Sequence, residues 1–230
     1  RKNNQGLTLV ELLVTFAILL IVMGSIITFL VTTTTLFKSS STETNIQNEA
    51  QLASNRIHDM LISASAGVTY YYVDGSSGNK SQVYQDPASG TASAKALYIY
   101  NWEDNPAAGA SEYGKKVMIY CIIFNPAKEE LDYIAYNYST DSSGNIVEVD
   151  PAGDASRADE TNILSKYVTD FSVKLYNAST GAVNTLLKNQ VYYKITFSLN
   201  GKNYKTKNTV TIRNNVEING NLSVVAVIPA

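Results

Sequence analysis

The chain has 230 residues, of which 18 are basic and 20 are acidic, so its formal net charge is -2. This balance gives no general electrostatic attraction to nucleic acid or to anionic lipid, which argues against nucleic acid as a partner. Cys121 is the one cysteine, which excludes an internal disulfide. The length accommodates one membrane segment plus one domain of moderate size, held together by its core alone.

An apolar run begins shortly after a basic start. Between Gly6 and Phe37 the only charged residue is Glu11, and residues 12–31 carry no charge. About 20 such residues suffice to span hydrocarbon as a helix, and the run is too long for the core of a cleaved secretory signal. Arg1 and Lys2 precede it, so the positive-inside rule places the N-terminus in the cytoplasm and the bulk of the chain outside.

Glu11 is out of place in such a segment. A carboxylate near the middle of a spanning helix costs about 2.5–3.5 kcal/mol on insertion scales, so an acidic residue there indicates a functional site. The alternative is that Glu11 lies at the headgroup edge, paired with Lys2.

The residues around Glu11 favour function. The stretch "RKNNQGLTLVELLV" combines a basic leader, Gly6, an acid five places later and an apolar run. It resembles the class III signal of type IV pilins and type II secretion pseudopilins. The resemblance implies that a prepilin peptidase removes residues 1–6 and that the new N-terminal residue, Leu7, is N-methylated. Leu7 stands where the family most often has Phe.

The same resemblance implies a role for Glu11 and a set of partners. Leu7 would carry a new ammonium group, and Glu11 lies four residues on, about 6 Å along a helix axis. Pairing of these charges, within or between subunits, is implied to set the register of assembly. The implied partners are other pilins, major and minor, in a filament, the peptidase, an inner-membrane assembly platform, and the membrane before assembly.

After Phe37 the apolar run changes to an amphipathic pattern. Apolar side chains recur at spacings of three and four, which predicts one helical stripe that packs against a sheet. Gly67 is a natural stop. We therefore expect one helix from Leu7 to Ala66, with a soft spot at "KSSST". The stripe consists of Ile46, Ala50, Ala53, Ile57 and Leu61.

From residue 67 onward, short apolar runs alternate with turn residues. This pattern predicts an N-terminal helix laid on an antiparallel sheet, an α+β fold. Hairpin signals occur at residues 141–145 and at Asn200-Gly201, and the segments 74–93 and 101–112 are expected to be long loops. The expected strands are residues 67–73, 95–101, 115–125, 131–138, 145–150, 167–177, 191–200 and 203–214.

The C-terminal half resembles the larger minor subunits, the W-type minor pilins and the J-type pseudopilins. The resemblance rests on "NILSKYVTDFSVKLYN" followed by "VYYKITFSLNGKNYKTKNTVTIRNNV". It implies a low-copy subunit near the filament tip that helps to prime assembly.

Two further segments suggest binding sites but have plainer interpretations. Lys205, Lys207 and Arg213 could grip phosphates, but a charged edge strand that blocks unwanted pairing is the better interpretation. The segment 140–150 is oxygen-rich, but it lacks the ligand spacing of an EF-hand and fits a plain hairpin. No catalytic, cofactor or metal site is expected.

These patterns give one hypothesis with one alternative. The chain is expected to be a minor pilin of a type IV pilus and not an enzyme, located in the cytoplasmic membrane before assembly and in an extracellular pilus afterwards. The alternative is a pseudopilin of a type II secretion or competence DNA-uptake system. The expected parts are a leader (1–6), a transmembrane and filament-core helix (7–37), an amphipathic continuation (38–66) and a β-rich head (67–230).

Overall fold

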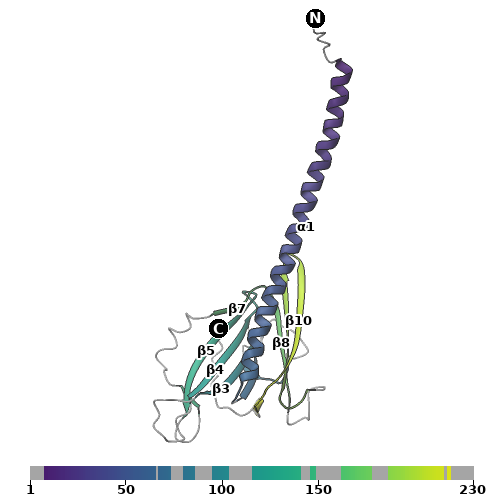
Figure 1. The fold of residues 1–230 in the computed structure, drawn as a ribbon. Helices are drawn as coiled ribbons and strands as arrows, with labels where there is room; N and C mark the ends of the chain where they lie inside the picture. Colours follow the sequence, from purple (N-terminus) through teal and green to yellow (C-terminus); the bar gives the residue numbers. More distant parts are fainter. Residues whose placement is uncertain are drawn as a thin grey trace. The chain divides into compact units, whose positions relative to one another are not determined.

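The computed structural model describes residues 8–65, 67–73, 80–85, 95–103, 116–140, 146–148, 162–177, 186–214 and 217–218. The chain divides into two compact units, Arg1–Asn45 and Ile46–Ala230. The first holds the apolar part of the helix, and the second holds the rest of the helix together with all the strands (Figure 1).

The helix α1 spans Leu9–Ser63 without interruption. The expected soft spot at residues 38–42 is absent, because this stretch is helical throughout. The helix also ends three residues before the expected Ala66. Ala64 N–H bonds back only to Leu61 O, and Ser65 N–H donates instead to Tyr100 O and to Asn101 Oδ1 (3.1 Å). The chain thus leaves the helix to join the end of a strand.

Eleven described strands form two sheets rather than the single sheet that the sequence pattern predicts. The large sheet has the order β11-β1-β3-β4-β5-β6, with β2 beside β1 and β7 beside β5, and the small sheet has the order β10-β9-β8. All described pairings are antiparallel except β1 with β11. The α+β class with antiparallel sheets is confirmed. The large sheet comprises β1 (Gly67–Val73), β2 (Lys80–Gln82), β3 (Lys95–Glu103), β4 (Lys116–Asn125), β5 (Glu130–Thr140), β6 (Ile146–Glu148), β7 (Asn162–Ser165) and β11 (Glu217–Ile218), and the small one comprises β8 (Val168–Leu175), β9 (Gln190–Leu199) and β10 (Lys202–Thr211).

Three short strands, β2, β7 and β11, were not predicted. β2 lies inside the segment expected to be a loop, and β11 has only two residues. β7 and β8 are separated by Lys166 and Tyr167, and Tyr167 has a φ of 63°. This left-handed turn, which is uncommon for a tyrosine, sends β7 to the large sheet and β8 to the small one.

The hairpin between β9 and β10 is confirmed. Asn200 and Gly201 have φ angles of 50° and 76°, the left-handed pair that a tight two-residue hairpin requires. The turn sets a register in which Lys202 lies opposite Leu199 and Val210 opposite Val191.

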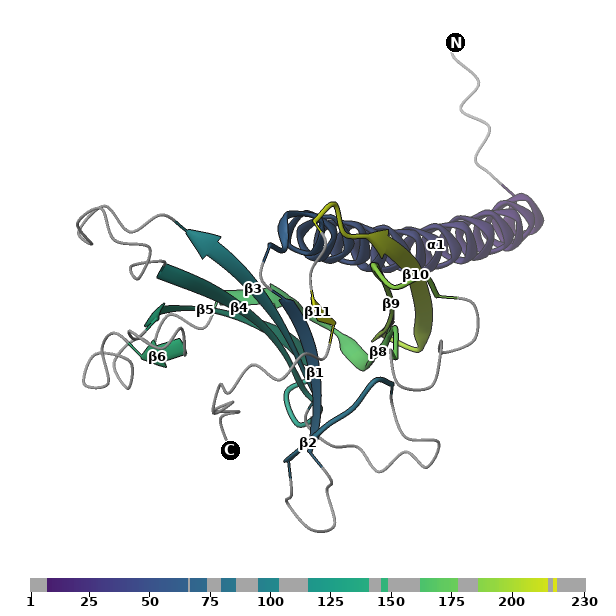
Figure 2. The ribbon, with the colours of Figure 1, turned by 90° about the horizontal axis from the view of Figure 1, so that it is seen from below.

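The core of the second unit lies where the end of α1 meets both sheets (Figure 2). Side chains of α1, of β1, β3, β4 and β5, and of β8, β9 and β10 form one cluster. Buried residues alternate strictly along β9, where Val191, Tyr193, Ile195 and Phe197 face inward. The other face of the small sheet is consequently left for polar side chains.

Candidate functional site

The first unit exposes an unusual amount of apolar surface. Nineteen large apolar side chains between Leu9 and Phe37 are solvent-exposed, including Leu9 at 80% and Ile21 at 70%. An exposed apolar surface of this extent marks a site that contacts lipid or another protein. The segment is long and apolar enough to cross a membrane, with a mean hydropathy of 2.7 over its best window.

Six hydroxyl side chains within this segment form hydrogen bonds with the helix backbone itself. The hydroxyls of Thr15, Ser25 and Thr28 donate to backbone carbonyls three or four residues earlier, at 2.9 Å. Those of Thr33, Thr34 and Thr35 do the same at 2.8–2.9 Å. Each hydroxyl donor is satisfied without water, so these residues are compatible with hydrocarbon or with a dry helix bundle.

Glu11 belongs to a capping box at the start of α1. Thr8 precedes the helix, and its backbone N–H and its hydroxyl both donate to Glu11 Oε2 at 3.0 Å. Glu11 N–H lies 3.3 Å from Thr8 Oγ1, which accepts from it. This reciprocal pattern satisfies donors that a helix start otherwise leaves open. Thr8 was missed in the sequence, although Thr-x-x-Glu before an apolar run is a recognisable signal.

Breaking the capping box should loosen the first turn. We expect Thr8→Val to cost about 1 kcal/mol of local helix stability, because a valine cannot accept from Glu11 N–H or donate to its carboxylate. The measurement is amide hydrogen exchange at residues 9–12 of the full chain in detergent micelles. Thr8→Ser keeps the hydroxyl and should exchange like the wild type, and equal exchange in both variants would contradict the cap.

The other residues of the expected cleavage site, Arg1, Lys2, Gly6 and Leu7, lie outside the described residues. The structure therefore places Glu11 and Thr8 together but gives no position for the residues on either side of the expected cut.

Comparison with known families singles out this same end of the chain. Residues 1–27 match the family model of the prokaryotic N-terminal methylation motif. No curated protein and no solved structure matches the chain.

The motif supports a type IV pilin-like or pseudopilin precursor. Subunits with this motif are structural, are processed by a prepilin peptidase and assemble with other pilins. The apolar start of α1 is consistent with a membrane anchor that precedes assembly. The match ends at residue 27, so it concerns the signal and the beginning of α1 and leaves the head unassigned.

In the second unit, the expected stripe faces the core. Ile46, Ala50, Ala53, Ile57 and Leu61 are each at most 1% exposed. Polar bonds fasten both sides of this part of α1. Glu49 Oε2 accepts from Ser165 Oγ at 3.0 Å on the large-sheet side, and Tyr193 O–H donates to Ser54 O at 2.9 Å on the small-sheet side. Burial raises the pKa of Tyr193 to about 12, so the phenol remains a donor at physiological pH.

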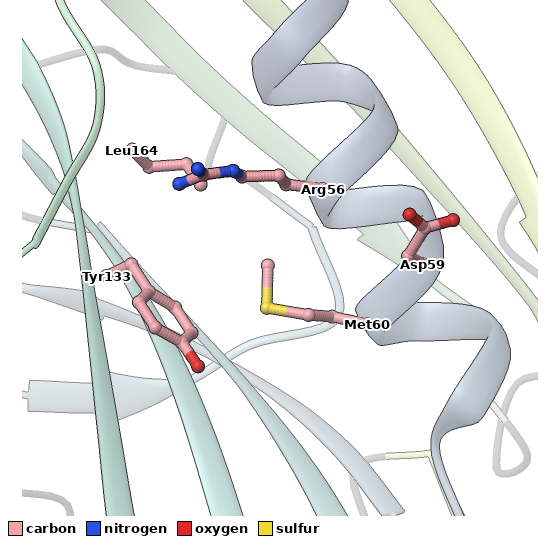
Figure 3. A pocket seen from close by; sticks show the side chains of 5 residues that line it. All are labelled: Arg56, Asp59, Met60, Tyr133 and Leu164. Carbon is pink, nitrogen blue, oxygen red and sulfur yellow. The ribbon is translucent and has the colours of Figure 1, made fainter.

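A shallow groove of about 310 Å³ lies between α1 and the β5–β7 side of the large sheet. Figure 3 shows Met60 pointing toward Tyr133 across the groove, while the Arg56 guanidinium extends toward Leu164. Asp59 completes the rim. The groove offers an apolar floor with one cation and one anion beside it, and it contains no catalytic constellation.

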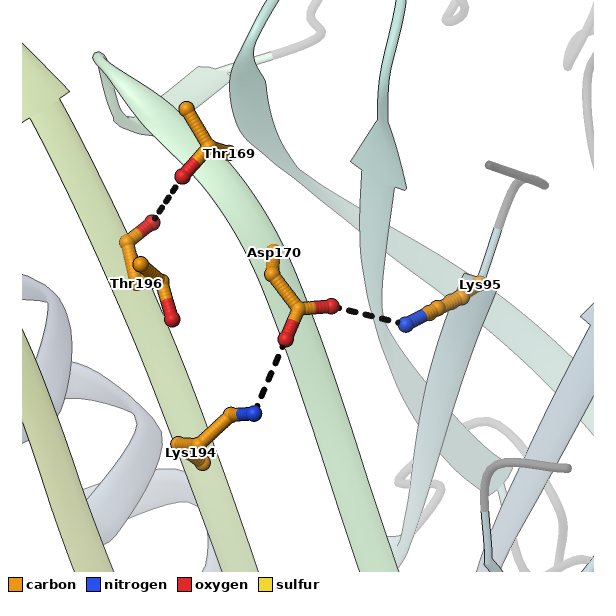
Figure 4. A network of polar contacts seen from close by, with 5 residues as sticks. All are labelled: Lys95, Thr169, Asp170, Lys194 and Thr196. Carbon is orange, nitrogen blue, oxygen red and sulfur yellow. Dashed lines mark hydrogen bonds and ion pairs between the residues drawn. The ribbon is translucent and has the colours of Figure 1, made fainter. Parts of the chain in front are cut away.

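A charged bridge joins the two sheets. Asp170 of β8 accepts from Lys95 of β3 at 2.9 Å through Oδ1 and from Lys194 of β9 at 3.0 Å through Oδ2 (Figure 4). Lys95 is buried, at 8% exposure, and its ammonium lies 6.0 Å from the centre of the Phe124 ring. Burial alone would raise the pKa of Asp170, but the hydrogen bonds and charges of Lys95 and Lys194 outweigh it, so the pKa is lowered.

Removing this carboxylate should destabilise the head. We expect Asp170→Asn to cost about 2 kcal/mol, less than a fully buried pair because the Asp170 side chain is 35% exposed. Since the folded-state pKa is lowered, the contribution is present above the ordinary pKa of 3.8 and is lost as the pH falls through the folded-state value. Urea unfolding of the full chain in detergent at pH 7 and at acidic pH measures both effects. Thr169→Ala, on the exposed neighbour, is the control, and a variant as stable as this control would contradict the bridge.

Among the described residues, neither Cys121 nor His58 has the surroundings of a catalytic group. Burial raises the pKa of the Cys121 thiol to about 12, which keeps it protonated and inert. His58 is exposed on α1. Within the described residues, no three His, Cys, Asp or Glu side chains group as metal ligands. Most of the segment 140–150, considered for calcium, lies outside the described residues.

Proposed function

We propose that the chain is a minor pilin of a type IV pilus, cleaved after Gly6, N-methylated at Leu7 and assembled through its N-terminal helix. The observation that carries the proposal is the methylation motif at residues 1–27, continued by the exposed apolar part of α1, which has Glu11 as its only charge up to Phe37. Its partners are other pilins, the prepilin peptidase, the inner-membrane assembly platform and, before assembly, the membrane.

The mechanism is assembly rather than chemistry. Before assembly, residues 7–37 span the cytoplasmic membrane with the N-terminus inside. In the filament, the same apolar surface packs against the helices of neighbours, which exchanges lipid contacts for protein contacts. The β-rich head lies outside, where it primes assembly near the tip or presents a surface.

In this mechanism Glu11 matches the ammonium of Leu7, in its own subunit or in an adjacent one. The capping box supports this role. Thr8, which precedes the first turn, donates two hydrogen bonds to Glu11 Oε2, and these bonds fix the rotamer of the carboxylate. In a low-dielectric filament core, a positioned carboxylate pairs strongly with an ammonium that has left water. The alternative is a purely local capping role, in which the charge of Glu11 has no partner in a neighbouring subunit.

The proposal is tested by measuring the protein composition of surface filaments sheared from cells with and without the prepilin peptidase. We expect the chain to be present at low copy beside a major pilin in cells with the peptidase, and to be absent from filaments of cells without it. A chain found only in membranes of both strains would contradict the proposal.

The runner-up is a pseudopilin of a type II secretion or competence system, which would carry the same motif. Genes next to this one separate the two candidates. A retraction motor and a major pilin indicate a pilus, whereas an outer-membrane secretion channel indicates a pseudopilus.

A further inference from the structure

Basic and acidic residues are segregated along this chain, although its net charge is close to zero. Residues 171–216 contain seven basic side chains and no acidic one, a net charge of +7. Residues 129–160 contain nine acidic side chains against Arg157 alone, a net charge of -8. A chain that is nearly neutral as a whole thus carries two stretches of large and opposite charge.

The small sheet gathers part of the positive charge on one face. Lys205 and Lys207 of β10 alternate with residues that face the core, and Lys174 of β8 and Lys194 of β9 share their side of the sheet. We call these four lysines the basic face. Lys174, Lys205 and Lys207 are exposed, and Lys194 is partly exposed.

The basic face lacks enough negative charge of its own. Lys207 lies directly opposite Lys194, an arrangement of like charges that destabilises a sheet. The carboxylate of Asp170 already accepts from both Lys194 and Lys95. Among ion pairs between described residues, none contains Lys205 or Lys207. The face therefore carries an excess of cations, and among the described strands its edge strand β10 pairs with β9 alone.

We propose that the basic face binds the acidic segment 129–160 of a second copy of this chain. Charge complementarity selects this occupant, since the four lysines of the basic face would meet a segment with a net charge of -8. The contact joins unlike surfaces, so copies of the chain associate head to tail. The inference goes beyond the proposed function, because two copies in one membrane suffice for the contact.

The test is zero-length cross-linking of the full chain in phosphatidylcholine vesicles, prepared from equal amounts of ¹⁴N- and ¹⁵N-labelled protein. A carbodiimide joins a lysine amine to a carboxylate only where the two touch. We expect mixed-isotope links between Lys205 or Lys207 and carboxylates of residues 129–160. Their yield should fall severalfold between about 0.1 M and about 1 M NaCl, as the screening length falls from about 10 Å to about 3 Å.

The variant with Lys205→Glu and Lys207→Glu should lose the mixed-isotope links. Its matched control, Lys188→Glu with Lys202→Glu, makes the same charge change at exposed lysines outside the basic face and should retain them. The four substituted lysines are all exposed, so both variants should fold. Circular dichroism checks the folding.

Three results would overturn the inference: same-isotope links alone, links that ignore the basic face, or no links together with salt-sensitive retention of duplex DNA by the basic face. The first would place the acidic segment on its own chain, and the last would make the partner a nucleic acid. The vesicle experiment needs neither peptidase nor pilus, so failure of the proposed function in cells would leave its result standing.

Discussion

Replacing Glu11 with alanine is expected to reduce incorporation into filaments about 100-fold while cleavage after Gly6 continues. The proposed pairing with the Leu7 ammonium takes place away from water, where losing one partner of an ion pair costs about 3 kcal/mol, equal to about 100-fold. The measurement is the amount of the chain in sheared filaments relative to the membrane fraction.

Glu11→Gln is the matched control for this prediction, because it separates the cap that the structure shows from the proposed charge pairing. Glutamine can retain the capping box with Thr8 but carries no charge. If the charge matters, both variants are poorly incorporated. If Glu11 serves only as a cap, the glutamine variant assembles like the wild type, and the pairing mechanism is wrong.

The second large effect is expected in the core of the head. Ile57 is fully buried between α1 and the sheets, and Ile57→Ala should lower the free energy of unfolding by about 3 kcal/mol through lost burial and the cavity left behind. Urea unfolding of the full chain in detergent, followed by tyrosine fluorescence, measures the loss. A change below about 1 kcal/mol would mean that α1 is not a structural part of the head.

Leu52 provides the control for Ile57 on the same helix. Its side chain is 60% exposed, so Leu52→Ala removes little buried surface and should change stability by no more than about 0.5 kcal/mol. Equal effects of the two substitutions would contradict the assignment of the buried stripe.

Local patterns predicted the parts of this fold that depend on local chemistry. The three- and four-residue spacing of Ile46, Ala50, Ala53 and Ile57 anticipated the helix face that the structure buries. The Asn200-Gly201 pair anticipated the hairpin because few other residues adopt two consecutive left-handed conformations.

The partition of strands into two sheets could not be predicted, since it depends on contacts distant in sequence. The turn at Tyr167 divides β7 from β8, yet tyrosine usually favours a continuous strand. β2 and β11 are held by pairing with β1 rather than by their own sequences. Likewise, the end of α1 is set by hydrogen bonds from Ser65 N–H to Tyr100 and Asn101. No helix-stop signal in the sequence predicts these bonds.

At the candidate site, two features were present in the sequence but overlooked. The Thr8-Glu11 spacing is a capping-box signal, and it gives Glu11 a local partner. The opposite charges of residues 129–160 and 171–216 disappear when only the total is counted. Counting charge by segment reveals this segregation without knowledge of the fold.

The central claim is that the chain is cut after Gly6 and matured at Leu7. The most direct test is the mass of its N-terminal peptide, isolated from cells with and without prepilin peptidase. The account predicts a peptide that begins at methylated Leu7 when the peptidase is present and an extended, unmethylated one when it is absent. An uncut N-terminus in both strains would contradict the account and would leave Glu11 as the cap of a membrane anchor.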